Sequence, residues 1–260
     1  CVQAAHQGGA SWVILCDTNG GSLPDEVYEI VTATKKAYPD VRLGIHCHND
    51  SGVAVANSLA AVKAGARQVQ GTLNGLGERC GNADLITLIP ALMLKQGYQT
   101  NIPKDKLSRL KPLSKMLDER LNRQSDAHAP YVGDAAFAHK GGLHASAAQK
   151  DSRTYEHIVP EIVGNQRSYL ISDQTGRSNI LARFKEVGIE IDSKDSRIES
   201  LISEVKHKEF SGWAFDSAEA SFELLARRRL DGVPDYFEID LDFNTMLCDS
   251  AHAVRVLRQM

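Results

Sequence analysis

Short apolar strand patterns alternate with helical patterns over the first hundred residues, and this alternation constrains the fold more than any other feature. Three segments are rich in the branched and apolar residues of buried strands: 11–16, 41–48 and 68–73. A helical pattern follows each of them, at 24–38, 53–64 and 84–97. A βαβαβα order requires a parallel sheet with right-handed crossovers, so the sequence predicts the α/β class. Spacing alone leaves both a closed barrel and an open sheet open.

The composition is that of an ordinary globular protein and excludes several other classes. Of the 260 residues, 42% are hydrophobic and 24% are charged. No apolar run approaches the ~18 residues of a membrane span, and the net charge of -3 gives no basic field to attract nucleic acid. The five cysteines are odd in number and form no CxxC pair. This indicates reduced thiols in a cytoplasmic protein rather than a disulfide framework.

The pattern changes after residue 97, where helical spacing predominates. Helical patterns recur in four segments: 104–122, 178–187, 194–209 and 217–229. Residues 236–243 alternate apolar and polar side chains with period two, which predicts one strand. We therefore expect three parts, namely an α/β domain, helical linker subdomains and the start of a further domain, over residues 1–100, 101–233 and 234–260.

The segment His46-Cys47-His48, at the carboxyl end of a predicted strand, is the strongest indication of chemistry. Successive strand side chains point to opposite faces, so His46 and His48 share one face and Cys47 points away. Sites of α/β proteins are built at this end of the strands, where two imidazoles can bind a divalent metal ion. The alternative is two polar histidines at a strand end, with Asn49 and Asp50 as turn formers.

A glycine-rich loop at 74–84 follows the next predicted strand. Its glycines permit tight turns, so as a bare loop it is consistent with a plain strand–helix connection. Beside a metal on the preceding strand, Asn82 is a candidate oxygen ligand, whereas Glu78 and Arg79 are equally consistent with a structural ion pair. Thr18, at the end of the first strand, can bind a carboxylate through its hydroxyl, and simple turn chemistry is the alternative.

Four segments together resemble the isopropylmalate/homocitrate/citramalate synthase family: 45–52, 77–83, 137–146 and 172–180. In the last two, His144-Ala145-Ser146 and Ser178-Asn179 resemble the citramalate branch more than the isopropylmalate branch. Members of this family are TIM-barrel enzymes that join acetyl-CoA to a 2-oxo acid. The resemblance implies that residues 1–100 are the last strands and helices of a TIM (β/α)8 barrel. A small, mostly helical region follows, as linker subdomains.

The resemblance also implies that the chain is a piece of a longer protein. Counterparts of only the sixth, seventh and eighth strands of the family barrel are found, and residues 234–260 resemble the start of the family's regulatory domain. Residues 2–6 resemble the tail of a helix, and residues 251–258 have helical spacing that stops without a cap, which agrees with this expectation.

The resemblance assigns roles to individual residues. It implies that His46, His48 and Asn82 bind a divalent ion, with Mg, Mn and Zn all open, and that Thr18 binds the substrate carboxylate. It also implies that His144, accompanied by Tyr155, enters the active site of the partner subunit in a homodimer. An imidazole there suits proton transfer or the activation of water.

The implied substrates are acetyl-CoA and pyruvate, which give citramalate in isoleucine and branched-chain amino acid biosynthesis. The synthesis of 2-isopropylmalate or homocitrate is the alternative within the family. A lyase of the hydroxymethylglutaryl-CoA type is a further alternative, against which the helical region argues, and an inactive dimerisation fragment is another. Neither a nucleic acid nor a membrane is expected as a partner.

Overall fold

The computed structural model describes residues 1–216, 218–230 and 232–233. These residues form two compact units, each with a hydrophobic core. The first unit contains residues 1–138 and 151–168, and the second contains residues 139–150 and the described residues from 169 onward.

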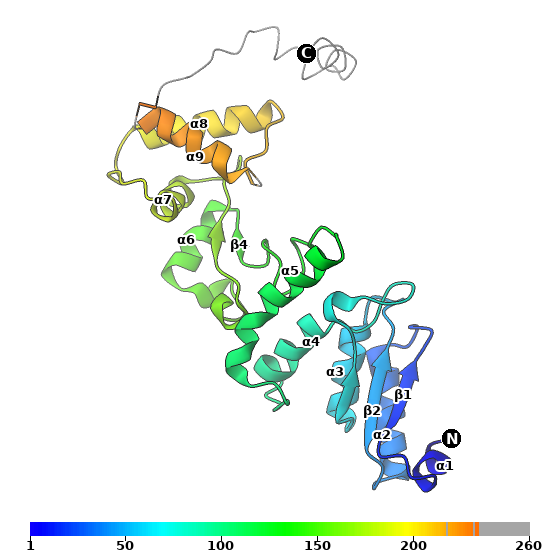
Figure 1. Ribbon diagram of the computed structural model, residues 1–260. Coiled ribbons are helices and arrows are strands. Elements are labelled where there is room, and N and C mark those ends of the chain that lie inside the picture. The colour runs from blue at the N-terminus through cyan, green and yellow to red at the C-terminus, as the bar shows by residue number, and fades with distance from the viewer. Residues whose placement is uncertain (217, 231, 234–260) are drawn as a thin grey trace, which may run out of the picture. The chain divides into compact units, whose positions relative to one another are not determined.

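The first unit is built on a three-stranded parallel sheet (Figure 1). Its strands pair in the order β1 (Val13–Asp17), β2 (Leu43–Cys47) and β3 (Gln68–Gln70). The connecting helices, α2 (Pro24–Ala37) and α3 (Ala54–Ala64), pack against each other. Consecutive parallel strands joined by helices are the singly wound arrangement of a barrel segment, which confirms the predicted α/β class.

Side chains of β2 alternate between two environments. Leu43, Ile45 and Cys47 are at most 2% exposed and belong to the core formed with α2 and α3. His46, between two of them, is only partly buried. One face of the sheet is therefore the core beneath the two helices, and the opposite face carries the histidine.

Local sequence signals determine where the helices of this unit begin and end. Pro24 occupies the first turn of α2, and the Glu26 carboxylate accepts the backbone N–H of Leu23 at 2.8 Å. Gly65 ends α3 with a φ of 122°, a conformation that favours glycine. The short helix α1 (Val2–Gln7) precedes β1, in agreement with the helical spacing predicted at 2–6.

Two helices predicted as continuous are interrupted near prolines. The predicted helix at 84–97 is α4 (Leu85–Pro90) followed by a wide turn, η2 (Ala91–Lys95), because Pro90 has no N–H to donate to the preceding turn. The predicted helix at 104–122 is a 3-10 segment, η3 (Lys104–Arg109), followed by α5 (Leu110–Arg120). Pro112 fits the first turn of α5, whereas a helix beginning at 104 would place it in the interior.

Short elements complete the first unit. They are η1 (Leu73–Gly75), η4 (Ser152–Thr154) and η5 (Pro160–Val163). The two-residue strands β4 (Ala138–His139) and β5 (Ser168–Tyr169) pair with each other. A second apolar cluster, which includes Leu107, Phe137 and Val163, draws on η3 and η5 and on α4 and α5. Throughout the part of the chain that the structure describes, every helix is too short or too polar to serve as a membrane span.

The second unit is mostly helical, with α6 (Gly142–Lys150), α7 (Arg177–Glu186), α8 (Arg197–Phe210) and α9 (Glu219–Leu230). Phe184 and Phe222 stack with ring centroids 6.3 Å apart, in a core that includes Ile180, Leu201 and Val205. The mostly helical region predicted downstream of the sheet is therefore confirmed. The strand predicted at 236–243 and the further domain at 234–260 lie outside the described residues.

Candidate functional site

His46 and His48 lie side by side at the carboxyl end of β2. Their ring centroids are 5.2 Å apart, and the ring planes meet at 67°. His46 is the penultimate residue of the strand, and His48 directly follows its last residue. In each ring, Nδ1 is buried and has no hydrogen-bond partner among the described residues. Two imidazoles with an unpaired nitrogen each thus gather where sites of α/β proteins are built.

Asn82 lies next to His48 because the glycine-rich loop folds back on the end of β2. The two residues form an antiparallel β-bridge, and the N–H of Ala83 donates to the Cys47 carbonyl at 3.0 Å. The Asn82 Nδ2 donates to the Leu76 carbonyl at 3.1 Å, while its Oδ1 is buried and has no partner in the described part of the chain. The amide oxygen is thus available as a ligand beside His48.

The backbone of this loop approaches itself so closely that Gly81 must be glycine. Its φ is 84°, in the left-handed region, and a Cβ atom there would collide with the Gly75 carbonyl oxygen. The same carbonyl accepts the N–H of Asn82 at 3.1 Å. The close approach that glycine allows therefore brings Asn82 back against the end of β2.

The donor atoms of His46, His48 and Asn82 fit a metal ion. Buried polar atoms without a partner are costly, and a bound cation satisfies nitrogen and oxygen lone pairs. Imidazole nitrogen and amide oxygen are ligands of Zn, Mn and Mg ions. Among the described residues, no three His, Cys, Asp or Glu side chains form a metal-binding group. The three residues would thus supply only part of a ligand set, with an amide as one member.

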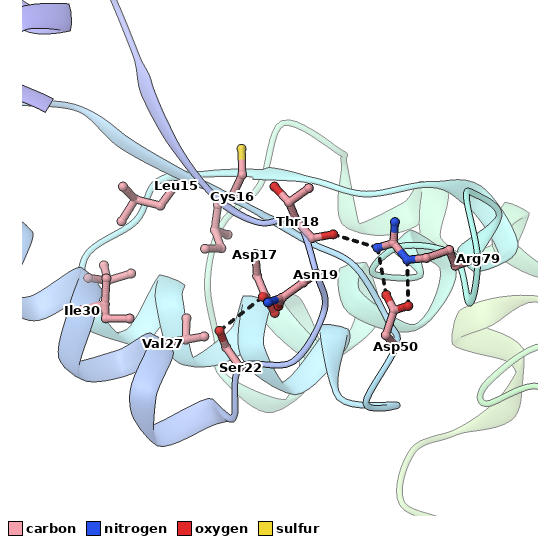
Figure 2. Close-up of a pocket in the computed structure, with 12 residues that line it drawn as sticks. Leu15, Cys16, Asp17, Thr18, Asn19, Ser22, Val27, Ile30, Asp50 and Arg79 are labelled. Carbon is pink, nitrogen blue, oxygen red and sulfur yellow. Dashed lines mark hydrogen bonds and ion pairs between the residues drawn. The ribbon is translucent and has the colours of Figure 1, made fainter. Parts of the chain in front are cut away.

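Thr18 directly follows β1, on the strand next to the histidines. The last residue of β1, Asp17, pairs with Cys47, and its carbonyl accepts the N–H of His48 at 3.1 Å. Thr18 is exposed and lines a pocket of about 860 Å³ (Figure 2). Side chains of β1 and α2, together with Ile45, form the apolar end of this pocket, so the pocket opens on the sheet face opposite His46, and Asp50 lies at its polar end. Thr18 and His48 therefore border the same edge of the sheet.

The Arg79 guanidinium connects the loops at this edge. Its Nε and Nη2 donate to the two carboxylate oxygens of Asp50 at 2.8 and 3.0 Å, and Nη2 also donates to the Thr18 carbonyl at 2.7 Å. The side-chain hydrogen bonds from Arg79 lower the pKa of the Asp50 carboxyl, and those same bonds raise the pKa of Arg79. Glu78, the sequence neighbour considered for an ion pair, is 3.8 Å from the guanidinium. Arg79 therefore pairs mainly across loops.

His144 and Tyr155, the predicted catalytic residues, belong to different compact units. His144 lies on α6 in the second unit, beside Leu143, which is 77% exposed. Tyr155 follows η4 in the first unit and is 45% exposed. Their approach to the histidine pair therefore stays a prediction.

The sequence reasoning missed two neighbours of the histidine pair. Gln70 of β3 pairs in register with His46, so both side chains lie on one face of the sheet. The period-two alternation that places His46 also places Gln70, so this signal was present. Asp50, considered only as a turn former, is the main partner of Arg79, which lies 29 positions away. No local sequence pattern predicts a contact between residues so far apart in the chain.

Two family models match the chain. Residues 1–113 match the HMGL-like model, and residues 131–211 match the homocitrate synthase post-HMGL domain-like model. The (R)-citramalate synthases of Aquifex aeolicus and Synechocystis are 53% and 49% identical over 92% and 87% of this chain. The 2-isopropylmalate synthase of Methanocaldococcus jannaschii is 39% identical over 78% of it. The chain spans 45%, 42% and 39% of the length of these relatives, respectively.

Proposed function

The chain belongs to the isopropylmalate/homocitrate/citramalate synthase family, and on this premise we propose that the protein condenses acetyl-CoA with pyruvate to give citramalate and CoA. Five (R)-citramalate synthases, 46–53% identical to this chain, support that choice of substrates. The observation that carries the proposal is the pair of imidazoles 5.2 Å apart, each with a buried Nδ1 that is unpaired within the described residues.

His46 and His48 would hold a divalent ion through their ring nitrogens, and Asn82 would add its amide oxygen. When bound, a Mg, Mn or Zn ion supplies Lewis-acid polarisation of the keto group and stabilises the charge that develops on its oxygen. Cys47 takes no part in this binding. Its side chain lies on the opposite face, and burial raises the pKa of its thiol to about 11, so the sulfur stays protonated.

Thr18 would bind the carboxylate of the 2-oxo acid through its hydroxyl, one strand away from the imidazoles. Asp50 shares the Arg79 guanidinium with the Thr18 carbonyl, and the negative charge of Asp50 alone would repel a carboxylate at this edge of the sheet. The two hydrogen bonds from Arg79 offset that charge. The ion pair therefore keeps the edge beside Thr18 suitable for an anionic substrate.

His144 and Tyr155 would act where acetyl-CoA reacts. The methyl group gives up a proton, its carbon forms a bond to the keto carbon, and water then cleaves the thioester to release CoA. The imidazole of His144 suits the proton transfer or the activation of that water, because imidazole gains and loses protons near neutral pH. We expect a cytoplasmic homodimer, in which His144 of each subunit enters the active site of the other.

The synthesis of 2-isopropylmalate is the second candidate, because the Methanocaldococcus enzyme of that name is 39% identical to this chain. The two functions differ in the oxo acid, which is pyruvate for one and 2-oxoisovalerate for the other. A lyase of the hydroxymethylglutaryl-CoA type has less support. The match to the post-HMGL domain at 131–211 extends the similarity beyond the HMGL-like segment.

A substrate panel tests the proposal. CoA release by the whole protein is measured with a thiol reagent, with acetyl-CoA and pyruvate, 2-oxobutyrate, 2-oxoisovalerate or 2-oxoglutarate in turn. We expect the fastest release with pyruvate, its loss after chelation and its return with Mg, Mn or Zn. Preference for 2-oxoisovalerate would assign the second candidate, and no release with any oxo acid would refute the proposal. Light scattering at working concentration tests the homodimer.

A further inference from the structure

Three loops meet at the carboxyl edge of the sheet, and one side chain bonds all of them. Arg79 belongs to the loop after β3. It donates two hydrogen bonds to Asp50, in the loop after β2, and one to the carbonyl of Thr18, in the loop after β1 (Figure 2). Its partners lie 29 and 61 positions away in the sequence. The guanidinium therefore ties together segments that the strands alone bring near each other.

The loops around this side chain are in close contact, so a shift of one displaces the others. The N–H of Ser51 donates to the Gly20 carbonyl at 3.0 Å, and the N–H of Asn49 donates to the Gly81 carbonyl at 3.0 Å. A Cβ atom at Gly20 would collide with the carboxylate of Asp50. A displacement of Asp50 would therefore also displace the loop after β1.

The backbone of Arg79 adopts an unfavourable conformation for a residue with a side chain. Its φ is 56°, in the left-handed region that glycine adopts without strain. Such a conformation persists only where surrounding contacts hold it. The three hydrogen bonds of the guanidinium, to Asp50 and to the Thr18 carbonyl, are contacts of that kind.

We infer that Arg79 is a positioning residue, which fixes the separation between Thr18 and His48 and thereby the fit of a 2-oxo acid. This inference rests on the proposed function, in which Thr18 holds the carboxylate and His48 holds the metal. Asp50 follows His48 by two residues, so the bond to Asp50 restrains the metal side and the bond to Thr18 restrains the carboxylate side. A planar guanidinium makes these three directed bonds, and a lysine ammonium does not reproduce them.

The substitution Arg79→Lys retains the positive charge and removes the planar group that donates several hydrogen bonds. Groups that hold metal ligands in place contribute about 10–100-fold to metal affinity or activity. We therefore expect the KM for the oxo acid to rise by at least about tenfold in R79K. The KM for acetyl-CoA should stay unchanged, because neither restrained loop is assigned to that substrate.

Arg197 provides a matched control in the second unit. Its Nε and Nη2 donate to Asp195 at 3.1 and 2.7 Å, and its Nη1 donates to the Leu230 carbonyl at 3.0 Å. The exposed fractions of the two pairs are similar, 52% and 19% for Arg197 and Asp195 against 41% and 24% for Arg79 and Asp50. R197K should leave both KM values unchanged. An effect seen only in R79K then cannot be a general consequence of removing an arginine that bonds a carboxylate and a carbonyl.

Hydrogen exchange supplies a readout that does not depend on activity. In the whole protein, peptides that contain Asn49 and Ser51 should exchange faster in R79K than in the wild type or R197K, with α3 unchanged. Unchanged loop exchange, or an unchanged KM for the oxo acid in an active enzyme, would overturn the inference. A wild-type protein that releases no CoA would instead contradict the proposed function, and the exchange data alone would then decide whether Arg79 holds the loops.

Discussion

Adjacent residues of β2 should separate stability from metal binding. Ile45 is 2% exposed and packs in the core beneath α2 and α3, whereas His46 lies on the opposite face beside His48. The two side chains are neighbours in sequence but contact different surroundings. We therefore predict opposite phenotypes for Ile45→Ala and His46→Ala.

The magnitudes follow from what each substitution removes. Ile45→Ala deletes three buried carbon groups, worth about 0.8 kcal/mol each, and leaves a cavity, for a total of about 3–4 kcal/mol. His46→Ala removes a buried nitrogen that is unpaired within the described residues, which relieves about 1–3 kcal/mol. It also loses the edge contact with His48, worth about 0.5–1.5 kcal/mol. The metal-free stability of H46A should therefore lie between about 0.5 kcal/mol below and about 2.5 kcal/mol above that of the wild type.

Native-state hydrogen exchange of peptides from β2, measured on the chelated whole protein, gives the stability of the first unit. Calorimetric titration with Mn²⁺ gives the metal affinity. We expect I45A to lose stability and bind Mn²⁺ once folded, and H46A to keep stability and lose binding. Ile45→Val, which removes one methyl group, should cost about 0.5–1.5 kcal/mol and serves as the graded control. Equal destabilisation by I45A and H46A, or loss of Mn²⁺ binding in folded I45A, would refute the two-face arrangement.

Four further outcomes follow from the same structure. Because burial raises the pKa of Cys47 to about 11, iodoacetamide at pH 8 should modify exposed Cys16 and Cys80 and spare Cys47. Detection of a Cys47 adduct by mass spectrometry of the native protein would contradict this. Arg79 lowers the pKa of Asp50, so the contribution of the Arg79–Asp50 pair to stability is present above pH 3.8 and is lost only as the pH falls through the lowered pKa. Amide hydrogen-exchange rates of the loops, corrected for the intrinsic pH dependence of exchange, should therefore agree at pH 5 and pH 7. His144→Gln in the whole protein should lower kcat by about 10²–10⁴-fold with Mn²⁺ affinity intact, and an unchanged kcat would remove His144 from the mechanism. Metal at 100 times its Kd should stabilise the first unit by about 2.7 kcal/mol, and H48A should abolish this gain in thermal or exchange measurements.

Strand positions were predictable because buried strands carry a continuous apolar signal, but strand lengths were not. The segment predicted at 68–73 forms a ladder only over Gln68–Gln70. Gln70 pairs with His46, and β2 ends one residue later, at Cys47. Beyond that point Thr72 turns to the glycine-rich loop, where its N–H donates to the Ala83 carbonyl at 3.0 Å. The length of β3 depends on register with its neighbour, which no single segment contains.

The interrupted helices were errors of a different kind, because their cause is visible in the sequence. Pro112 lies in the middle of the apolar pattern at 104–122, where a continuous helix would force its ring against the carbonyl of residue 108. Hydrophobic spacing remains in phase across the 3-10 segment and α5, so periodicity alone joins them. Weighting the proline above the periodicity would have given the boundary.

The histidine pair was predictable because two imidazoles on one face of a strand do nothing for the packing of the fold. Rules of burial explain every residue of β2 on the core face, yet they give no reason for imidazoles on the other face with unpaired buried nitrogens. Asn82 adds a third polar atom in the same condition. A ligand that bound all three atoms would remove this cost, so the cluster supports the proposed metal site. The Arg79–Asp50 pair, in contrast, follows the ordinary rules of pairing and becomes visible only once the loops are in place.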